Sequence, residues 1–247
     1  MVDVLGWRKV FGVLAPSTNT VVEPDYYRMS VPGVTSHVAR IHIRDQTLAD
    51  NEDFEKLLDQ IRQEINAACD RVLTCEPDYL VMGMSAETFW GGVEGNRQFT
   101  ENLEKHSGKQ VATGADAVRR ALDLLGARRV GVVTPYQPIA DENVRLFLSE
   151  AGYDVVNLVG LRCPSAVDIA RVTEDTLRQS LLEVDGPDVD ALIQVGTNLS
   201  MVRLADEAER WLRKPVIAIN AATWWHALRT NGIADRIQGC GTLLREH

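Results

Sequence analysis

Residues 78–92 read DYLVMGMSAETFWGG and combine an apolar strand with the loop that follows it. Positions 78–83 are almost continuously apolar, which is typical of a parallel strand covered by helices on both faces. The strand ends at Gly83, at the carboxyl edge where open α/β sheets bind their ligands. The stretch therefore predicts an α/β fold with an active-site loop at this point, and a glycine where a reactive side chain is often found.

The rest of the chain alternates short apolar runs with amphipathic helices, a pattern that predicts βαβ units on parallel sheets. Strands are expected at 9–16, 78–83, 109–114, 128–135, 154–160, 190–196 and 214–220. Helices are expected at 52–73, 96–106, 115–126, 140–151, 166–184, 200–213 and 221–231.

The two halves of the chain resemble each other in three places that occur in the same order. FGVLAPST (11–18) matches VGVVTPYQ (130–137), and DYLVMGMS (78–85) matches ALIQVGTN (191–198), which sets Gly83 against Gly196. KQVATGADAVRRAL similarly matches KPVIAINAATWWHAL. Such repetition indicates a duplicated unit. Chance similarity among α/β strands is the alternative.

A duplication predicts two Rossmann-like lobes, each a small parallel sheet flanked by helices, related by a pseudo-twofold axis. We expect the first lobe to contain residues 1–114 plus 221–247 and the second to contain 115–220. The carboxyl edges of the two sheets would then surround one cleft, which is the expected active site.

Composition limits the classes of partner and setting. The formal charge of −9 and the pI near 5.1 argue against nucleic acid and anionic membrane surfaces. No apolar run is long enough to span a bilayer, and the N-terminus lacks the order of a signal peptide. The four cysteines have no paired spacing, which favours free thiols and a cytoplasmic location. No nucleotide-binding glycine motif and no metal-ligand cluster is evident, so we expect neither cofactor nor metal.

Five loops carry a family resemblance: LAPSTNT (14–20), GMSAETF (83–89), TPYQP (134–138), VGTNLS (195–200) and IAINAATWWHALR (217–229). In order and spacing they resemble the maleate cis-trans isomerase and arylmalonate decarboxylase branch of the aspartate/glutamate (hydantoin) racemase superfamily. The resemblance extends from about residue 10 to residue 232. It implies the same two-lobed fold, with a cofactor-independent active site between the lobes.

The resemblance also implies a cysteine at the end of one strand in each half, and this chain has none there. The matching slots hold Gly83 and Gly196. None of the four cysteines matches either slot, so two-thiol chemistry is excluded. Arylmalonate decarboxylases share the first glycine but keep the second cysteine.

The groups that hold carboxylate oxygens in the family do have matches here. They are Ser17, Asn19, Ser85, Tyr136, Thr197 and Asn198. Met84 replaces the usual threonine and removes one hydroxyl donor. Helix N-termini behind these turns add backbone N–H donors. The alternative interpretation is that several of these residues only cap helices or shape turns.

Glu87 is the nearest acid or base to the missing thiol, and with Tyr136 it is the expected catalytic residue. In an apolar pocket formed with Met84, Phe89 and Trp90, its carboxyl would have a raised pKa suited to proton transfer. A glutamate in the first turn of a helix is also a common dipole partner. His226, Trp224 and Trp225 are interpreted mainly as packing residues, although a tryptophan could also wall the cleft.

Three functions remain open at this level. The first is a thiol-independent enzyme, most simply a lyase or decarboxylase, that holds a small carboxylate, cyclic imide or lactone-like substrate in an oxyanion pocket. The second is a cis-trans isomerase or racemase that uses other acid and base groups. The third is a non-catalytic carboxylate-binding protein. A homo-oligomer is compatible with each.

Overall fold

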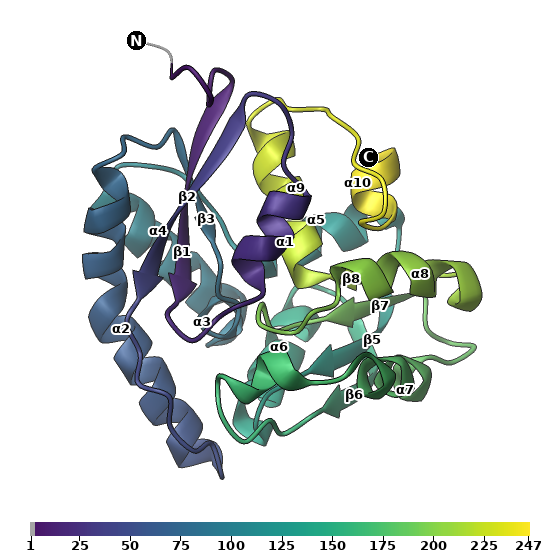
Figure 1. Cartoon of the computed structure of the whole chain (residues 1–247). Coiled ribbons are helices and arrows are strands. Elements are labelled where there is room, and N and C mark those ends of the chain that lie inside the picture. The colour runs from purple at the N-terminus through teal and green to yellow at the C-terminus, as the bar shows by residue number, and fades with distance from the viewer. Residues whose placement is uncertain (1–2) are drawn as a thin grey trace.

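The computed structural model describes residues 3–247 and contains two four-stranded parallel sheets (Figure 1). The first comprises β1 (Lys9–Pro16), β2 (Val34–Ile41), β3 (Tyr79–Met82) and β4 (Val111–Ala112), in the order β2-β1-β3-β4. The second comprises β5 (Arg129–Thr134), β6 (Asp154–Gly160), β7 (Ala191–Gln194) and β8 (Val216–Ala218), in the order β6-β5-β7-β8. The repeated strand order confirms the predicted α/β fold and its duplication.

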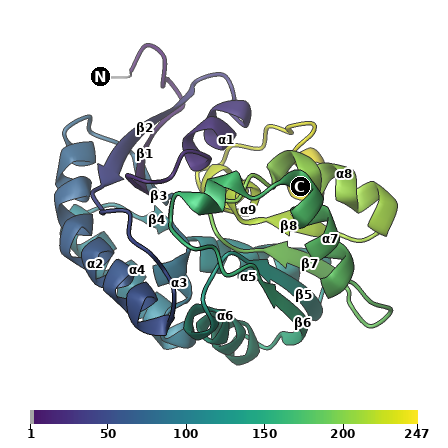
Figure 2. The same cartoon turned by 60° about the horizontal axis from the view of Figure 1, so that its bottom comes forward.

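Helices cover both sheets. They are α1 (Val22–Arg28), α2 (Asn51–Leu73), α3 (Ala86–Phe89), α4 (Gly92–Ser107), α5 (Gly114–Leu125), α6 (Pro138–Glu150), α7 (Glu174–Val184), α8 (Val202–Leu212), α9 (Ile219–Thr230) and α10 (Thr242–Glu246). Figure 2 shows α2 and α4 together along the outer side of the first sheet. Within the described residues, no helix combines the length and apolar character of a membrane span.

Local sequence explains where the main elements begin and which face they bury. All four residues of β3 are buried, as expected for a strand between helical layers. The apolar stripe of α2 is buried, and the Asp50 side chain caps this helix by accepting from the Asp53 N–H. Thr113 caps α5 in the same way.

The structure differs from the sequence prediction in several elements. It adds β2, α1, α3 and α10, which were not expected. The helix predicted over 166–184 is instead a 3₁₀ helix at Asp168–Arg171 followed by α7, which starts at the Thr173 cap. The strand predicted over 109–114 shortens to β4, because Thr113 already caps α5.

Strand register corrects the internal alignment by one residue. The N–H of Gly83 donates to the carbonyl of Leu14 at 2.7 Å. At the same place in the second sheet, the N–H of Val195 donates to the carbonyl of Val133 at 2.9 Å. Because the paired strands otherwise keep equivalent registers, Val195 and not Gly196 is the counterpart of Gly83.

Helix α9 packs against α1, α5 and strands β3 and β4, so the chain returns to the first sheet after β8. Trp224 of α9 is 1% exposed and stacks on Tyr26 of α1 with ring centroids 4.8 Å apart. Its Nε1 donates to the Met29 carbonyl at 2.8 Å. Trp224 is therefore a core residue, in agreement with its interpretation as a packing residue.

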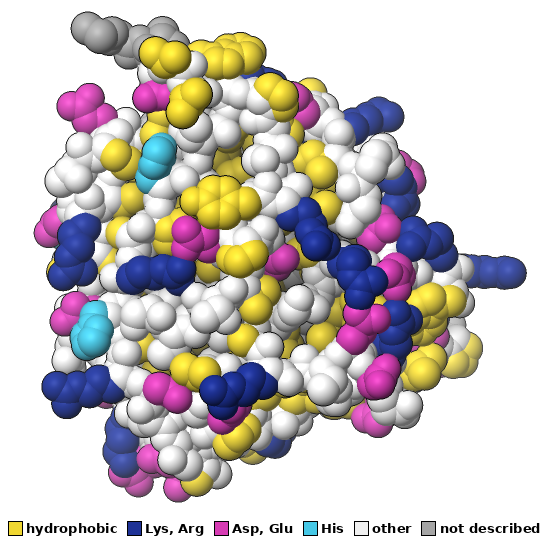
Figure 3. Space-filling view, viewed as in Figure 1, with side chains coloured by type: hydrophobic (Ala, Val, Ile, Leu, Met, Phe, Trp, Pro, Cys, Tyr) yellow, Lys and Arg dark blue, Asp and Glu magenta, His cyan; other side chains and the backbone are white. Residues whose placement is uncertain are grey.

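The two sheets point toward each other. In Figure 1 the arrowheads of both sheets face the region between them, and the turns after β1, β3, β5 and β7 meet there. The outer surface has a different character, because acidic and basic side chains are interspersed over the face shown in Figure 3. The fold thus places one neutral site at the junction of the sheets.

Candidate functional site

A cavity of about 60 Å³ lies where the turns of the two sheets meet. Its polar lining comes from Thr18, Asn19, Ser85, Tyr136, Thr197 and Asn198. Its apolar lining comes mainly from Ile43, Phe54, Leu57, Leu58, Ile61 and Ile169. None of the described residues that line it is charged, and none is a cysteine. The site therefore offers neutral hydrogen-bond donors beside an aliphatic surface.

Ser85 and Tyr136 form a hydroxyl pair across the junction, with their oxygens 2.8 Å apart. The Ser85 Oγ also accepts from the Gly196 N–H at 3.1 Å. Of the two hydroxyl protons, one is shared between the pair and one remains to donate elsewhere. Burial raises the pKa of Tyr136 well above its usual range, so the phenol stays protonated at neutral pH.

The turn after β7 is tied to the first sheet by side-chain hydrogen bonds. The Thr197 Oγ1 donates to the Gly83 carbonyl at 3.0 Å and accepts from the Asn19 amide at 3.0 Å. The Asn198 amide donates to the Ala166 carbonyl at 2.9 Å. These contacts hold the cavity lining of both halves in one arrangement.

Four backbone N–H groups at the cavity have no acceptor among the residues that the structure describes. Among the hydrogen bonds formed by residues 3–247, none uses the N–H of Met84, Ser85, Thr197 or Asn198. These four residues are 3%, 1%, 5% and 6% exposed. Unpaired N–H groups in buried turns are costly, and they are suited to hold a carboxylate or a developing oxyanion.

Loop sequence and strand register give different residues for the second slot. The family-like loop VGTNLS puts Gly196 there, and Gly196 lines the cavity, whereas the strand register pairs Gly83 with Val195. Gly196 has φ +103°, and an added Cβ would meet the Pro135 ring, so a side chain at this position would be strained. Neither residue is a cysteine, and the exclusion of two-thiol chemistry is unchanged.

Two expected carboxylate-binding residues have structural roles in this arrangement. Ser17 is exposed and lies outside the cavity, because its hydroxyl exchanges hydrogen bonds with the backbone of Ile43. Asn19 does line the cavity, but its Oδ1 accepts from the N–H groups of Val21 and Val22 at the start of α1. The capping interpretation therefore describes much of what Asn19 does.

Glu87 does not reach the cavity, contrary to the expected apolar pocket. Its Oε1 lies 2.7 Å from the Nε of Arg62, and it lines a separate groove of about 800 Å³ between α2 and α4. Burial raises the pKa of Glu87, while the Arg62 guanidinium opposes that shift. Trp90 shares this groove, and Phe89 turns away to pack on Phe147. The cause is the long-range ion pair with α2, which directs the carboxyl outward.

His226 is buried in α9, and its Nδ1 lies 3.0 Å from the Arg120 guanidinium. Burial and that cation lower its pKa to about 4, so the ring is neutral. It does not line the cavity. Apolar residues of α2 also line the cavity and were not among the expected site residues, because helical periodicity alone does not distinguish cavity lining from core.

The chain is similar to characterised proteins over most of its length. A family model described as arylmalonate decarboxylase matches residues 12–244. An arylmalonate decarboxylase from Bordetella bronchiseptica is 29% identical over 172 residues, which cover 67% of this chain and 70% of that protein. A maleate isomerase from Pseudomonas putida is 23% identical over 246 residues, which cover 94% and 96%.

Solved structures share the fold. A maleate cis-trans isomerase from Nocardia farcinica with a covalently bound succinylcysteine intermediate has a TM-score of 0.87 at 20% identity, covering 97% of this chain and 99% of that one. A crystal structure of arylmalonate decarboxylase has a TM-score of 0.76 at 22% identity, covering 95% and 98%.

Proposed function

The chain belongs to the arylmalonate decarboxylase family, and on that premise we propose that it is a thiol-independent decarboxylase of malonates that carry an apolar substituent. The observation that supports this proposal most directly is the lining of the cavity. Neutral donors occupy one part of it and aliphatic side chains of α2 occupy another, with no charged residue or thiol among the described lining residues. We further propose that this site lies between the two lobes expected from the sequence, 1–114 plus 221–247 and 115–220.

In this proposal, the retained carboxylate binds at the polar part of the cavity. The free proton of the Ser85–Tyr136 pair and the N–H groups of Thr197 and Asn198 donate to its oxygens. The substituent and the leaving carboxylate face the aliphatic surface. A carboxylate there is poorly solvated, and its conversion to neutral CO₂ relieves that cost.

The chemical step breaks the bond between the α-carbon and the leaving carboxylate. The electron pair of that bond moves onto the retained carboxylate, which becomes an enediolate, and CO₂ departs. Donors that are already in place stabilise this developing charge without reorganisation. The α-carbon then takes one proton from the Ser85–Tyr136 pair, which solvent replenishes.

Isomerisation of maleate is the alternative, and the cavity favours it less. The related Nocardia isomerase carries a succinylcysteine, whereas no cysteine is among the described residues that line this cavity. The α2 side also lacks a polar side chain for a second carboxylate at the far end of the substrate.

The test is to incubate the purified protein with phenylmalonate and with maleate, and to follow both by ¹H NMR. We expect phenylmalonate to give phenylacetate and CO₂, and maleate to remain unchanged. Formation of fumarate would establish the isomerase instead. Saturable binding of phenylmalonate without product would establish a binding protein.

Two variants locate the chemistry within the molecule. Tyr136→Phe is expected to lower kcat/KM by about 10- to 150-fold, since it removes a donor to a charged group. Glu87→Gln is expected to stay within about threefold of wild type, because the carboxyl faces the outer groove. The opposite order of effects would return the catalytic role to Glu87.

A further inference from the structure

Two buried amide side chains lie behind the cavity and hold carbonyl groups of the turn after β7. We propose that Gln194 and Asn220 are positioning residues, which aim the N–H groups of Thr197 and Asn198 at the bound carboxylate. This inference rests on the proposed function, because it assigns that carboxylate to the cavity. Neither amide lines the cavity itself.

Asn220 is 2% exposed and lies in the first turn of α9. Its Nδ2 donates to the Thr197 carbonyl at 3.0 Å and to the Asp25 carboxylate of α1 at 2.8 Å. The carboxylate accepts only from the NH₂ side of the amide, so it sets which way Asn220 faces. The Thr197 carbonyl is thereby held on the α9 side of the turn.

Because the Thr197 carbonyl is held in place, the geometry of the peptide bond also fixes the direction of the Asn198 N–H. No described peptide bond is cis. In a planar trans peptide, the carbonyl and the following N–H point in opposite directions. Because the Thr197 carbonyl points to Asn220, the Asn198 N–H points away from α9, toward the cavity that Thr197 and Asn198 line.

Gln194 holds the carbonyls of the 195–196 and 196–197 peptides, which come just before the 197–198 peptide. It is 1% exposed, and its Nε2 donates to the carbonyls of Val195 and Gly196 at 2.8 and 2.7 Å. The Gly196 N–H, opposite the first carbonyl, reaches the Ser85 Oγ at 3.1 Å, which is the direction that the peptide geometry requires. The same reasoning directs the Thr197 N–H into the cavity. The positive φ of Gly196 lets consecutive N–H groups converge.

The duplicated fold indicates that Gln194 is not needed to build the sheet. Its counterpart at the end of β3 is Met82, which is apolar and fully buried. A buried amide in place of an apolar side chain is costly unless its hydrogen bonds are used. Here they are used on the turn that borders the cavity.

The experiment compares Gln194→Met, which copies the residue of the first sheet, with Asn220→Ala. Both are expected to lower kcat for phenylmalonate by about 10- to 100-fold, with a smaller change in KM. The control is Asn96→Ala, which removes a buried amide that donates to the Thr88 carbonyl at 2.9 Å, outside the cavity. It is expected to lower the melting temperature but not kcat per folded molecule. A kcat within about threefold of wild type in both test variants would overturn the proposal.

A second measurement separates this inference from the proposed function. If wild type neither binds nor converts phenylmalonate, the proposed function fails, but the crystal structures of the two variants still decide the positioning role. A rotated 196–197 or 197–198 peptide supports it, and an unchanged turn in both variants overturns it. If Asn220→Ala does not fold, Gln194→Met and its 196–197 peptide decide alone.

Discussion

Different structural constraints favour glycine at positions 83 and 196. A Cβ at Gly83 would lie 3.0 Å from the Leu14 carbonyl oxygen and 3.1 Å from the Ala15 Cβ, which is tight but needs no unusual backbone. A Cβ at Gly196 would lie 2.6 Å from the Pro135 ring, at φ +103°. Conformation and contact therefore both oppose a side chain at Gly196.

This difference predicts unequal costs of adding a methyl group. Gly196→Ala is expected to lower the free energy of unfolding by about 2–4 kcal/mol, from the left-handed backbone and from overpacking. Gly83→Ala is expected to cost about 1 kcal/mol, because the Leu14 carbonyl and the neighbouring side chains need shift by only a few tenths of an ångström. Urea unfolding of both variants measures this. A larger loss for Gly83→Ala would contradict this ranking of backbone strain and overpacking.

Asp25 predicts a pH dependence of stability. Burial raises its pKa from 3.8 to about 6, although Asn220 and Arg28 oppose the shift. Between these two values the unfolded chain binds fewer protons than the folded one, so this group makes stability fall as pH rises from about 4 to 6. The loss is about 2–3 kcal/mol and is complete above pH 6.

The measurement is urea unfolding of wild type and Asp25→Asn at pH 4.5 and pH 7.5. Asparagine cannot ionise, so the variant is expected to gain stability relative to wild type by about 2 kcal/mol between the two pH values. This comparison is insensitive to any constant effect of the substitution. A constant difference at both pH values would show that Asp25 is not the group responsible.

At the scale of elements, two connecting segments meet beside the cavity, to whose lining they contribute Ile43 and Ala166. The segment between β2 and α2 meets the one after β6 through an isolated bridge of Thr47 with Ser165 and a 2.7 Å bond from the Leu48 N–H to the Pro164 carbonyl. Gln137 donates to the Leu48 carbonyl at 2.6 Å. A cavity of about 60 Å³ holds only a few waters, so a substituted malonate requires the lining to move apart. We expect these two segments to act as a cover that separates when the ligand enters.

Opening predicts a protection pattern in amide hydrogen exchange. The Leu48 amide is expected to exchange much faster than strand amides such as Val13, because breaking a few bonds at the cover exposes it. Saturating phenylmalonate is expected to slow Leu48 without changing Val13. Exchange at Leu48 as slow as at Val13, with no response to ligand, would show that access lies elsewhere.

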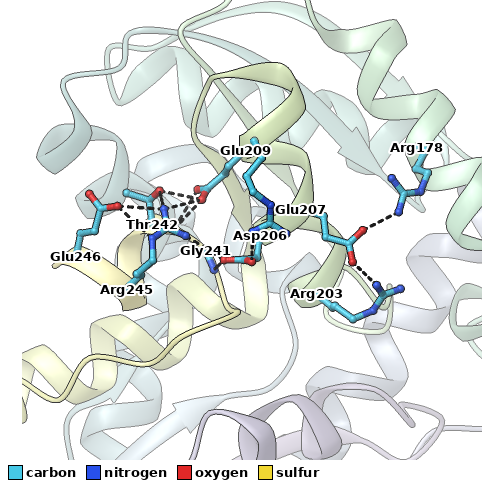
Figure 4. Close-up of polar contacts among 10 residues, drawn as sticks. Arg178, Arg203, Asp206, Glu207, Glu209, Gly241, Thr242, Arg245 and Glu246 are labelled. Atoms are coloured by element: carbon cyan, nitrogen blue, oxygen red, sulfur yellow. Dashed lines mark hydrogen bonds and ion pairs between the residues drawn. The ribbon is translucent and has the colours of Figure 1, made fainter.

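At the scale of the whole molecule, polar contacts fix the C-terminal helix α10 to α8, which belongs with the second sheet. Figure 4 shows Glu209 and Asp206 of α8 facing α10. Glu209 accepts from the Thr242 N–H at 3.0 Å, and Arg245 reaches Asp206 at 3.0 Å. Both carboxylates are about nine-tenths buried, with side chains 9% and 10% exposed. We call this set of contacts between α8 and α10 the clamp, and none of its residues lines the cavity.

Arg245→Ala is therefore expected to lower the free energy of unfolding by about 2 kcal/mol, because two largely buried carboxylates lose a charged donor. The value of kcat should not change. Arg97→Ala on α4, whose partners Glu94 and Glu101 are exposed, serves as the control and is expected to have a smaller effect. Thermal unfolding and turnover, measured on the same samples, check both statements. Equal losses in the two variants would contradict the clamp.

The sequence by itself determined the fold class, the duplication and the absence of cysteines from the strand ends, because these follow from local pattern and residue identity. The continuously apolar β3 and the amphipathic α2 predict their own structure. The strand β2 was missed because VTSHVARI is polar and only partly buried. A strand of this kind is stabilised by pairing with β1 rather than by its own pattern.

Only the tertiary structure decided which side chains share the cavity. Glu87 is two residues from Ser85, yet Arg62 holds it in the outer groove. Ser85 meets Tyr136, which lies 51 residues away in the chain, only because the two sheets face each other. The equivalence of Gly83 with Val195 required hydrogen bonds between strands. These outcomes depend on contacts between distant segments, which local propensity does not encode.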